Sequence, residues 1–309
     1  MISIPLVSVV LPVFNASETI HDAIDSILKQ SYANFELIII NDGSTDSSDA
    51  VIRSFSDERI LYLKNESNRG LIYTLNRGLS SSKGKYIARM DADDISCPDR
   101  FQKQVDVLES NPSIIVCGTK IKTFGMRKAT FSLQLPESSK AIKERLLLEV
   151  PFAHPTVMIR REVLLAYNLS YDIHYPSSED YKFWVDLSSY GEFYNIQEPL
   201  LNYRISATQV SSSTKSRQID SSVKCRRLYL QKMLGHIDLP DTVTLSTIQS
   251  LKPYFSSNKY LLPILYLSLE RYTLTTFFQF VFSFAWLHFD STLLARFLSR
   301  FIFKKSKLL

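Results

Sequence analysis

The chain has 309 residues, enough for one large α/β domain with an appendage or for two domains, and 45% of them are hydrophobic, which predicts a sizeable core. The net charge is +5, yet residues 1–290 hold 31 basic and 31 acidic side chains, because the excess lies entirely after residue 290. Nucleic-acid-binding domains carry an excess of basic residues, so the balanced charge of residues 1–290 argues against a nucleic-acid partner.

The cysteines and the N-terminus indicate the compartment. Cys97, Cys117 and Cys225 are odd in number and widely spaced, so they fit neither a disulfide framework nor a zinc-binding pattern. This usage favours a reducing, cytosolic compartment. The first six residues lack the basic region and the cleavage site of a signal peptide, so export by that route is not expected.

In chain order, the first half alternates strand and helix patterns. Apolar, β-branched runs predict buried strands at 6–13, 35–40, 60–63 and 85–90. Asn15 is expected to cap a helix with an apolar stripe, and further helices are expected after the 41–46 turn and near 70–82. Strands and helices at this spacing predict a doubly wound, mostly parallel α/β sheet with flanking helices.

Polar residues follow the ends of these strands. Asn15, Asp42, Asn68 and Asp91 each come just after a predicted strand end. The carboxyl ends of parallel strands meet at one edge, where such sheets bind ligands, so these side chains are expected to gather there.

The most informative segment is Asp-Ala-Asp-Asp at 91–94, directly behind the fourth strand. Asp91 and Asp93 are two residues apart and would point the same way in extended backbone. Carboxylates crowded in this way repel one another unless a cation lies among them, and one Mg²⁺ or Mn²⁺ could meet both. The alternative is a solvated acidic turn.

The middle of the chain continues the α/β pattern. Pro98 is expected at the first position of a helix that reaches about residue 109, and a strand is expected at 114–118. A short strand at 154–159 is expected to reach the same edge of the sheet, and a helix is expected to begin at 177–180. Residues 206–217 are rich in serine and predict a mobile loop.

The last third differs in character. Residues 272–289 form the longest charge-free stretch, which only just has the length to span a bilayer and contains several polar side chains. Residues 293–307 alternate basic and large apolar side chains, as in an interfacial amphipathic helix with a polybasic end. We expect peripheral attachment to the cytoplasmic face of the membrane, the alternatives being a true span, or a packing domain or oligomer contact.

Four motifs occur in order, each at a predicted strand end or helix start: Val-Val-Leu-Pro-Val-Phe-Asn at 9–15, Asn-Asp-Gly-Ser-Thr-Asp at 41–46, Arg-Met-Asp-Ala-Asp-Asp at 89–94 and Glu-Asp-Tyr-x-x-Trp at 179–184. With them, residues 5 to 211 resemble the family 2 glycosyltransferases, which have the GT-A fold. We therefore expect a GT-A nucleotide-sugar-binding and catalytic domain at 1–217 and a C-terminal helical region with the basic tail at 218–309.

The resemblance implies a nucleotide diphospho-sugar donor, most simply a UDP-sugar. The base would lie by Pro12 and Asn15, with Asp42 accepting a hydrogen bond from the uracil N–H. Asn68 would add a polar contact or, equally well, cap a helix. Asp91 would face the ribose and the metal, and Asp93 would ligate the Mn²⁺ or Mg²⁺ that bridges the diphosphate.

Glu179 and Asp180 would supply the other half of an inverting, single-displacement site. Asp180 is assigned as the general base on the acceptor hydroxyl, kept ionised by the helix dipole. Glu179 would contact the acceptor or orient the site, the alternative being a simple preference for acidic residues at a helix start.

Further candidates for the site come from the same resemblance. His154 and, more weakly, Trp184 would lie on the acceptor side, although His154 also fits a structural role. Arg204 would neutralise phosphate charge or form a surface salt bridge. Many relatives have a histidine two residues after this arginine, where the present chain has Ser206.

Other classes fit less well. The first strand is followed by no glycine, which excludes the Gly-x-Gly-x-x-Gly loop of a Rossmann dehydrogenase. The glycine-rich, basic loop of a sugar nucleotidyltransferase is also absent. The expected function is sugar transfer, of hexosyltransferase type, to a glycan or lipid-linked acceptor in envelope polysaccharide synthesis, such as capsule or O-antigen. The alternative is a retired transferase that only binds nucleotide-sugar or scaffolds partners.

Overall fold

The computed structural model describes residues 6–125, 134–147, 149–206 and 215–233. The chain divides into two compact units, Met1–Cys225 and Arg226–Leu309, and the elements given below lie in the first, except that the last helix, α9, continues into the second. The expected segments at 272–289 and 293–307 lie outside the described residues, as does most of the expected 206–217 loop. Among the helices that are described, none is long and apolar enough to cross a membrane.

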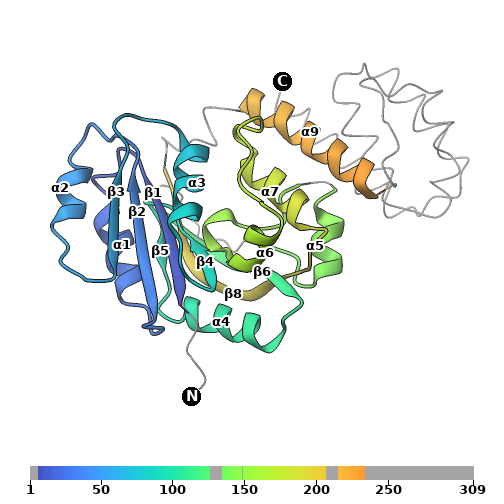
Figure 1. Cartoon of the computed structure of the whole chain (residues 1–309), viewed down its shortest axis with the longest axis horizontal. Helices are drawn as coiled ribbons and strands as arrows, with labels where there is room; N and C mark the ends of the chain where they lie inside the picture. Colours follow the sequence, from blue (N-terminus) through green and yellow to red (C-terminus); the bar gives the residue numbers. More distant parts are fainter. Residues whose placement is uncertain (1–5, 126–133, 148, 207–214, 234–309) are drawn as a thin grey trace, which may run out of the picture. The chain divides into compact units, whose positions relative to one another are not determined.

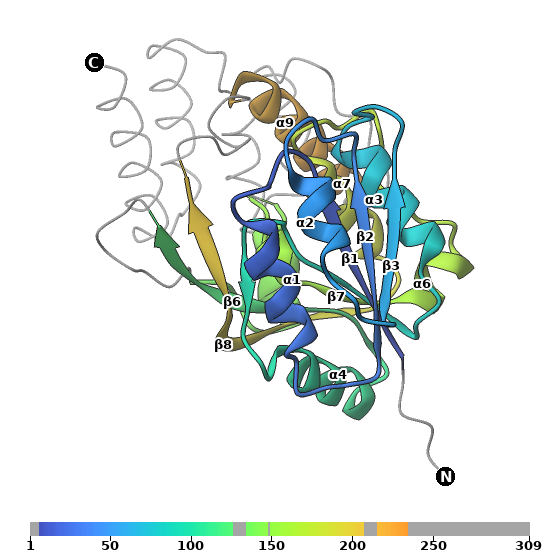
Figure 2. The same cartoon turned by 90° about the vertical axis from the view of Figure 1, so that its left-hand side faces the viewer.

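One eight-stranded sheet forms the framework, in the order β3-β2-β1-β4-β7-β6-β8-β5 (Figures 1 and 2). Its strands are β1 (Val7–Val13), β2 (Phe35–Asn41), β3 (Ile60–Lys64), β4 (Tyr86–Arg89), β5 (Ile95–Ser96), β6 (Ile114–Gly125), β7 (Met158–Arg160) and β8 (Glu192–Ile205). The helices are α1 (Ile20–Leu28), α2 (Ser48–Arg53), α3 (Leu71–Ser81), α4 (Arg100–Ser110), α5 (Ser139–Arg145), α6 (Arg161–Ala166), α7 (Glu179–Leu187) and α9 (Lys215–Met233), with a 3₁₀ turn, η1 (His154–Thr156).

The first half of the sheet is parallel, as predicted. β1 pairs in parallel with β2 and β4, and β2 pairs in parallel with β3. Every residue of β1 is buried because helices cover both faces of the sheet. Gly78 of α3 permits close packing on one face, since a Cβ there would lie 2.4 Å from a methyl group of Val10. The resulting core carries the polar loops at the carboxyl ends of the strands.

The second half is mixed rather than parallel. β7 runs antiparallel to both β4 and β6, β5 runs antiparallel to β8, and β6 and β8 are parallel to each other. The expected strand at 154–159 is therefore shorter than predicted: residues 154–156 form η1, and only β7 pairs with the sheet. Pro155 explains the difference, because it has no N–H with which to join a ladder.

Two predicted helix starts are wrong in detail. Asn15 does not cap α1, which begins five residues later with Thr19 at the N-cap position. Asn15 has a φ of 47°, a left-handed conformation that asparagine tolerates in turns. Pro98 is not the first residue of α4, because the helix begins at Arg100 and the Pro98 carbonyl instead accepts a hydrogen bond from the Ser31 N–H at 2.8 Å.

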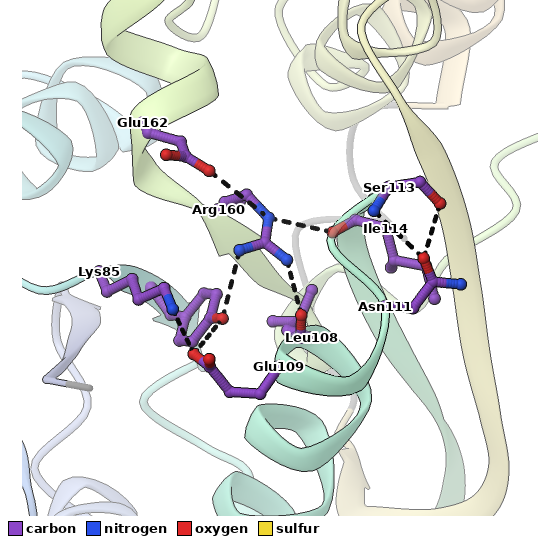
Figure 3. A network of polar contacts seen from close by, with 9 residues as sticks. Lys85, Leu108, Glu109, Asn111, Ser113, Ile114, Arg160 and Glu162 are labelled. Carbon is purple, nitrogen blue, oxygen red and sulfur yellow. Dashed lines mark hydrogen bonds and ion pairs between the residues drawn. The ribbon is translucent and has the colours of Figure 1, made fainter. Parts of the chain in front are cut away.

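A buried arginine joins the two halves of the sheet at the end opposite the polar loops (Figure 3). Arg160 of β7 donates to the carbonyls of Leu108 at 2.7 Å and Ile114 at 3.3 Å, and to the Tyr86 hydroxyl at 3.3 Å. The Tyr86 hydroxyl in turn donates to Glu109 at 2.6 Å, and Lys85 pairs with the same carboxylate. The network ties β4 and β7 to the end of α4 and the start of β6.

We expect Tyr86→Phe to lower the free energy of unfolding by about 1–2 kcal/mol, because it leaves Arg160 without one of its buried acceptors. Lys85→Ala removes a more exposed partner of the same carboxylate and should cost less than about 1 kcal/mol. Urea unfolding of both variants measures the difference, and equal losses would contradict a structural role for the buried hydroxyl.

Candidate functional site

The loops after β1 and β2 are locked together by hydrogen bonds. The Asn15 N–H donates to the Ser44 hydroxyl at 3.0 Å, and the Asn15 side-chain oxygen accepts from the Thr45 N–H at 2.9 Å. The Ser17 N–H donates to Asp46 at 2.9 Å. Pro12 lies buried in β1, beyond the part that pairs with β4. The left-handed Asn15 therefore positions a loop beside the end of β1, where the sequence predicted the base to lie.

Asp42 organises the next loop along the edge. It is 4% exposed and accepts hydrogen bonds from the Asn65 side chain at 2.6 Å and from the Arg69 and Gly70 N–H groups at 2.9 Å each. The adjacent Gly43 has a φ of 67°, and a Cβ there would lie 2.5 Å from the Ser67 carbonyl carbon. Asp42 thus holds a tight approach of two loops that only glycine allows.

Asn68 fits the capping alternative in this structure. Its side-chain oxygen accepts a hydrogen bond from the Gly70 N–H at 3.0 Å, and Gly70 is the N-cap residue of α3. The Asn68 side chain is exposed, so it can still make a polar contact from the loop.

The 91–94 segment is a turn rather than extended backbone. The Asp94 N–H bonds to the Asp91 carbonyl at 3.4 Å, and this reversal brings ligand atoms of Asp91, Asp93 and Asp94 within 4.8 Å of one another. Asp91 and Asp93 lie close together, as predicted, but a turn brings them together and not extended backbone. Asp94 was not assigned as a ligand from the sequence. The Thr19 hydroxyl donates to the Ala92 carbonyl at 3.0 Å, which ties this turn to the loop after β1.

The chemistry of this acidic turn fits a divalent cation. Asp94 is 1% exposed, and among the described residues its Oδ2 atom has no hydrogen-bond partner. Burial and the Asp91 charge raise the pKa of Asp93 to about 6, and burial with the two neighbouring carboxylates raises the pKa of Asp94. A bound Mg²⁺ or Mn²⁺ would stabilise the ionised form of both carboxylates and so counteract the rise in their pKa values. A purely solvated acidic turn does not account for a buried, unpartnered carboxylate oxygen.

Arg89 is a site residue to which sequence reasoning gave no role. It is 5% exposed, and both of its terminal nitrogens donate to the Asp91 carboxylate. Its charge also offsets part of the rise in pKa that burial causes in Glu179 and Asp180, and it adds to the lowering of the His154 pKa that burial causes. The signal for it was a single basic residue at the end of an otherwise apolar strand, directly before the carboxylates.

The start of α7 places Glu179 and Asp180 near the acidic turn. Burial raises the pKa of Asp180, and burial together with the Asp180 charge raises the pKa of Glu179 to about 7. The sequence predicted that the helix dipole keeps Asp180 ionised; in the structure, burial raises the pKa of Asp180 despite its place at the start of α7. Asp180 is half-buried, whereas Glu179 is 9% exposed.

His154 packs against Trp184, which lies on the buried side of α7. The His154 ring nitrogen Nε2 lies 2.8 Å from the Tyr171 hydroxyl, and burial and Arg89 lower the pKa of His154 well below its usual value, so the ring is neutral. Trp184 is fully buried and packs edge-on against His154 and Phe152, at centroid distances of 5.9 and 5.1 Å. Trp184 has no exposed surface for an acceptor, and its packing helps to fix the His154 ring.

Arg204 closes the site from β8. Its backbone N–H donates to Asp94 at 2.9 Å, and its side-chain Nε donates to the Asp93 carbonyl at 2.8 Å. The guanidinium lies 4.5 Å from the centre of the Phe124 ring. Arg204 thus holds positive charge beside the acidic turn, as a phosphate-neutralising role requires.

Comparison with known proteins gives a consistent family assignment. The model of the family described as Glycosyl transferase family 2 matches residues 8–167. An uncharacterized glycosyltransferase of Haemophilus influenzae is 36% identical over 90% of both chains. The Escherichia coli enzyme WfgD, named UDP-Glc:alpha-D-GlcNAc-diphosphoundecaprenol beta-1,3-glucosyltransferase, is 29% identical over 67% of this chain and 80% of its own.

A solved structure of TarS from S. aureus in complex with UDP-GlcNAc has the same fold. The TM-score is 0.61, with 17% sequence identity over 81% of this chain and 75% of TarS residues 1–349. This similarity confirms the predicted GT-A architecture.

The raised pKa of Glu179 predicts a pH-dependent difference in stability. The unfolded chain releases this proton near pH 4.5 and the folded chain near pH 7, so the folded state loses stability as pH rises between these values. Glu179→Gln carries no such proton. Its free energy of unfolding relative to the wild type should therefore increase by about 1–3 kcal/mol from pH 5 to pH 8.

Chemical denaturation over that pH range, without metal or nucleotide, makes the measurement. Glu18→Gln replaces an exposed glutamate and is the control, for which the difference from wild type should stay level. A level difference for Glu179→Gln would overturn the buried, charge-coupled description of this carboxylate.

Proposed function

The chain belongs to glycosyl transferase family 2, and we propose that this glycosyltransferase moves a sugar from a UDP-sugar, with inversion, to a hydroxyl of a lipid-linked glycan. One observation carries the proposal: the acidic turn at 91–94 is tied to the nucleotide-side loops by Thr19 and to β8 by Arg204, and it lies within electrostatic reach of Asp180. Donor-side and acceptor-side groups thus meet at one edge of the sheet.

On the donor side, this chain's residues bind and orient the nucleotide. Pro12 and Asn15 flank the base. The Asp42 carboxylate accepts hydrogen bonds from backbone N–H groups and so fixes the loop against which the base lies. Arg89 holds the Asp91 carboxylate in a bidentate pair, which orients it toward the ribose and the metal.

Asp93, Asp91 and Asp94 would hold the divalent cation. When bound, Mn²⁺ or Mg²⁺ supplies Lewis-acid stabilisation of the charge that develops on the departing UDP. Arg204 adds a fixed positive charge on the same side of the turn. The donor preference for UDP rests on the TarS complex with UDP-GlcNAc and on the UDP-glucose named for WfgD.

On the acceptor side, Asp180 takes the proton of the attacking hydroxyl. Burial raises the pKa of Asp180 and so makes it a stronger base than an exposed aspartate, while the Arg89 charge limits the increase. Glu179 beside it orients the acceptor hydroxyl. Neutral His154, fixed by Tyr171, offers a hydrogen-bonding edge to the acceptor.

We place the reaction at the cytoplasmic face of the membrane. The diphosphoundecaprenol acceptor named for WfgD and the polybasic, apolar residues at 293–307 of this chain both support a polyprenyl diphosphate-linked acceptor in envelope polysaccharide synthesis. The acceptor is thus itself bound to the membrane that the tail would contact.

Asp180→Asn separates this enzyme from a retired nucleotide-sugar-binding protein. With Mn²⁺ and a panel of UDP-sugars, the wild type should release UDP, and the variant should lose this activity by about 10²–10⁴-fold because it lacks the base. The Kd for UDP should change less than about threefold. Asp186→Asn, on the same helix but paired with Lys182, is the matched control and should stay active.

Two results would contradict the assignment. Turnover retained in Asp180→Asn would remove the base role from this residue. A wild type that binds UDP but releases none from any UDP-sugar, with or without a glycan acceptor, would favour the retired transferase.

The tail makes a separate prediction. A chain that ends before Ser291 loses five basic residues and should no longer sediment with vesicles rich in phosphatidylglycerol, while its UDP release stays within about twofold of the full chain. Complete retention on the vesicles after truncation would show that the tail is not the attachment site.

A further inference from the structure

The outer part of the ribbon formed by β6 and β8 belongs to two segments whose charged residues are all basic, although β8 also contains Glu192 and Glu198 nearer its start. Residues 110–136 contain four basic side chains and no acidic one, and residues 199–219 contain three basic side chains and no acidic one. They are Lys120, Lys122, Arg127, Lys128, Arg204, Lys215 and Arg217. These two segments together carry seven positive charges in a chain whose net charge is +5, so the rest of the chain is slightly acidic.

Three of these side chains lie on one face of the ribbon. Lys120 and Lys122 alternate along β6 with the buried residues Ile121 and Thr123, so they point to the same, more open face. Phe124 continues this alternation and is paired in register with Arg204 of β8. The Arg204 guanidinium lies 4.5 Å from the Phe124 ring, which places it on the same face. We call Lys120, Lys122, Phe124 and Arg204 the basic face.

The basic face lies on the side of the sheet that carries α7. Gly118 precedes Lys120 by two residues and shares its face, and a Cβ at Gly118 would lie 2.6 Å from the Phe152 ring. Phe152 packs edge-on against Trp184 of α7, at a centroid distance of 5.1 Å. At its other end, the face reaches the acidic turn through the 2.8 Å bond from Arg204 to the Asp93 carbonyl. It therefore extends from the acidic turn along the acceptor side of the sheet.

The two lysines lack counter-charges in the part of the chain that the structure describes. Neither the Lys120 nor the Lys122 side chain has a hydrogen bond or an ion pair there, whereas Lys103, Lys143 and Lys182 each have a carboxylate within 4 Å. Lys122 is exposed and Lys120 is half-buried. Like charges side by side on one strand face repel, and an anion bound between them removes that repulsion.

We propose that the basic face binds the diphosphate group of the polyprenyl diphosphate-linked acceptor, with Lys120 and Lys122 as its principal ligands. This inference rests on the acceptor class given under the proposed function. A diphosphate offers several charged oxygens, and lysine ammonium groups bind phosphate as mobile point charges. Binding there would place the acceptor's phosphate end beside β6 and its sugar end toward Asp180.

Farnesyl diphosphate is a suitable probe of this site. Its binding is measured by calorimetry with UDP and Mn²⁺ at saturation, so that the donor site is already filled. In Lys120→Ala/Lys122→Ala the Kd for farnesyl diphosphate should rise at least about tenfold, while the Kd for UDP, measured separately, changes less than about twofold. Added NaCl should weaken farnesyl diphosphate binding more in the wild type than in the variant.

Lys83→Ala/Lys140→Ala is the matched control. It removes the same charge from two exposed lysines, one in the loop before β4 and one on α5, and should leave the farnesyl diphosphate Kd unchanged. Thermal unfolding midpoints within about 2 °C of each other would show that both double variants are folded. The measurement needs no turnover, so it is independent of whether UDP-sugars are cleaved.

Three outcomes would overturn the proposal. An unchanged Kd for farnesyl diphosphate in Lys120→Ala/Lys122→Ala would remove the lysines from the site. An equal loss of UDP affinity would assign them to the donor diphosphate. Loss of binding to phosphatidylglycerol vesicles, with farnesyl diphosphate binding intact, would make the basic face a membrane-contact surface instead.

Discussion

A single buried guanidinium at the end of β4 sets the electrostatics of the site. Arg89 forms a bidentate pair with Asp91 and acts on four further carboxylates: Asp93, Asp94, Glu179 and Asp180. Burial and the mutual repulsion of these carboxylates raise the pKa values of Asp93, Asp94, Glu179 and Asp180, and the Arg89 charge offsets only part of the rise. A divalent cation held by the acidic turn would reduce the remaining excess of negative charge.

The parallel half of the fold could be predicted from the sequence because each of its strands is a short, mostly apolar run that ends in a polar turn. β1, β2, β3 and β4 lie where the pattern placed them, and so do Asp42 and Asp91 at their carboxyl ends. The antiparallel insertion of β7 between β4 and β6 could not be predicted, because three residues of pairing leave almost no periodic signal.

The site shows the same division between local and tertiary information. Residue types at strand ends predicted which carboxylates gather, but the hydrogen bonds that hold Asp93 and Asp94 in place come from Arg204, which is far along the chain. Likewise, Trp184 was expected on the acceptor side, yet its packing against Phe152 and His154 buries it completely. Helix dipoles are a local effect of a few tenths of a kcal/mol to about 1 kcal/mol, and burial, which depends on the tertiary structure, raises the pKa values of Glu179 and Asp180 in spite of it.

Residues 1–290 carry as many basic as acidic side chains, and the whole excess of positive charge lies in the tail. That balance is an average, because the acidic turn and the start of α7 concentrate carboxylates, while the basic face carries Lys120, Lys122 and Arg204. Opposite charges held apart in this way create a local field, one side suited to a metal-bound donor diphosphate and the other to an acceptor phosphate. Two diphosphates would repel each other in a uniform environment. A cation-centred donor site next to a lysine-rich acceptor face allows both to approach one carboxylate base.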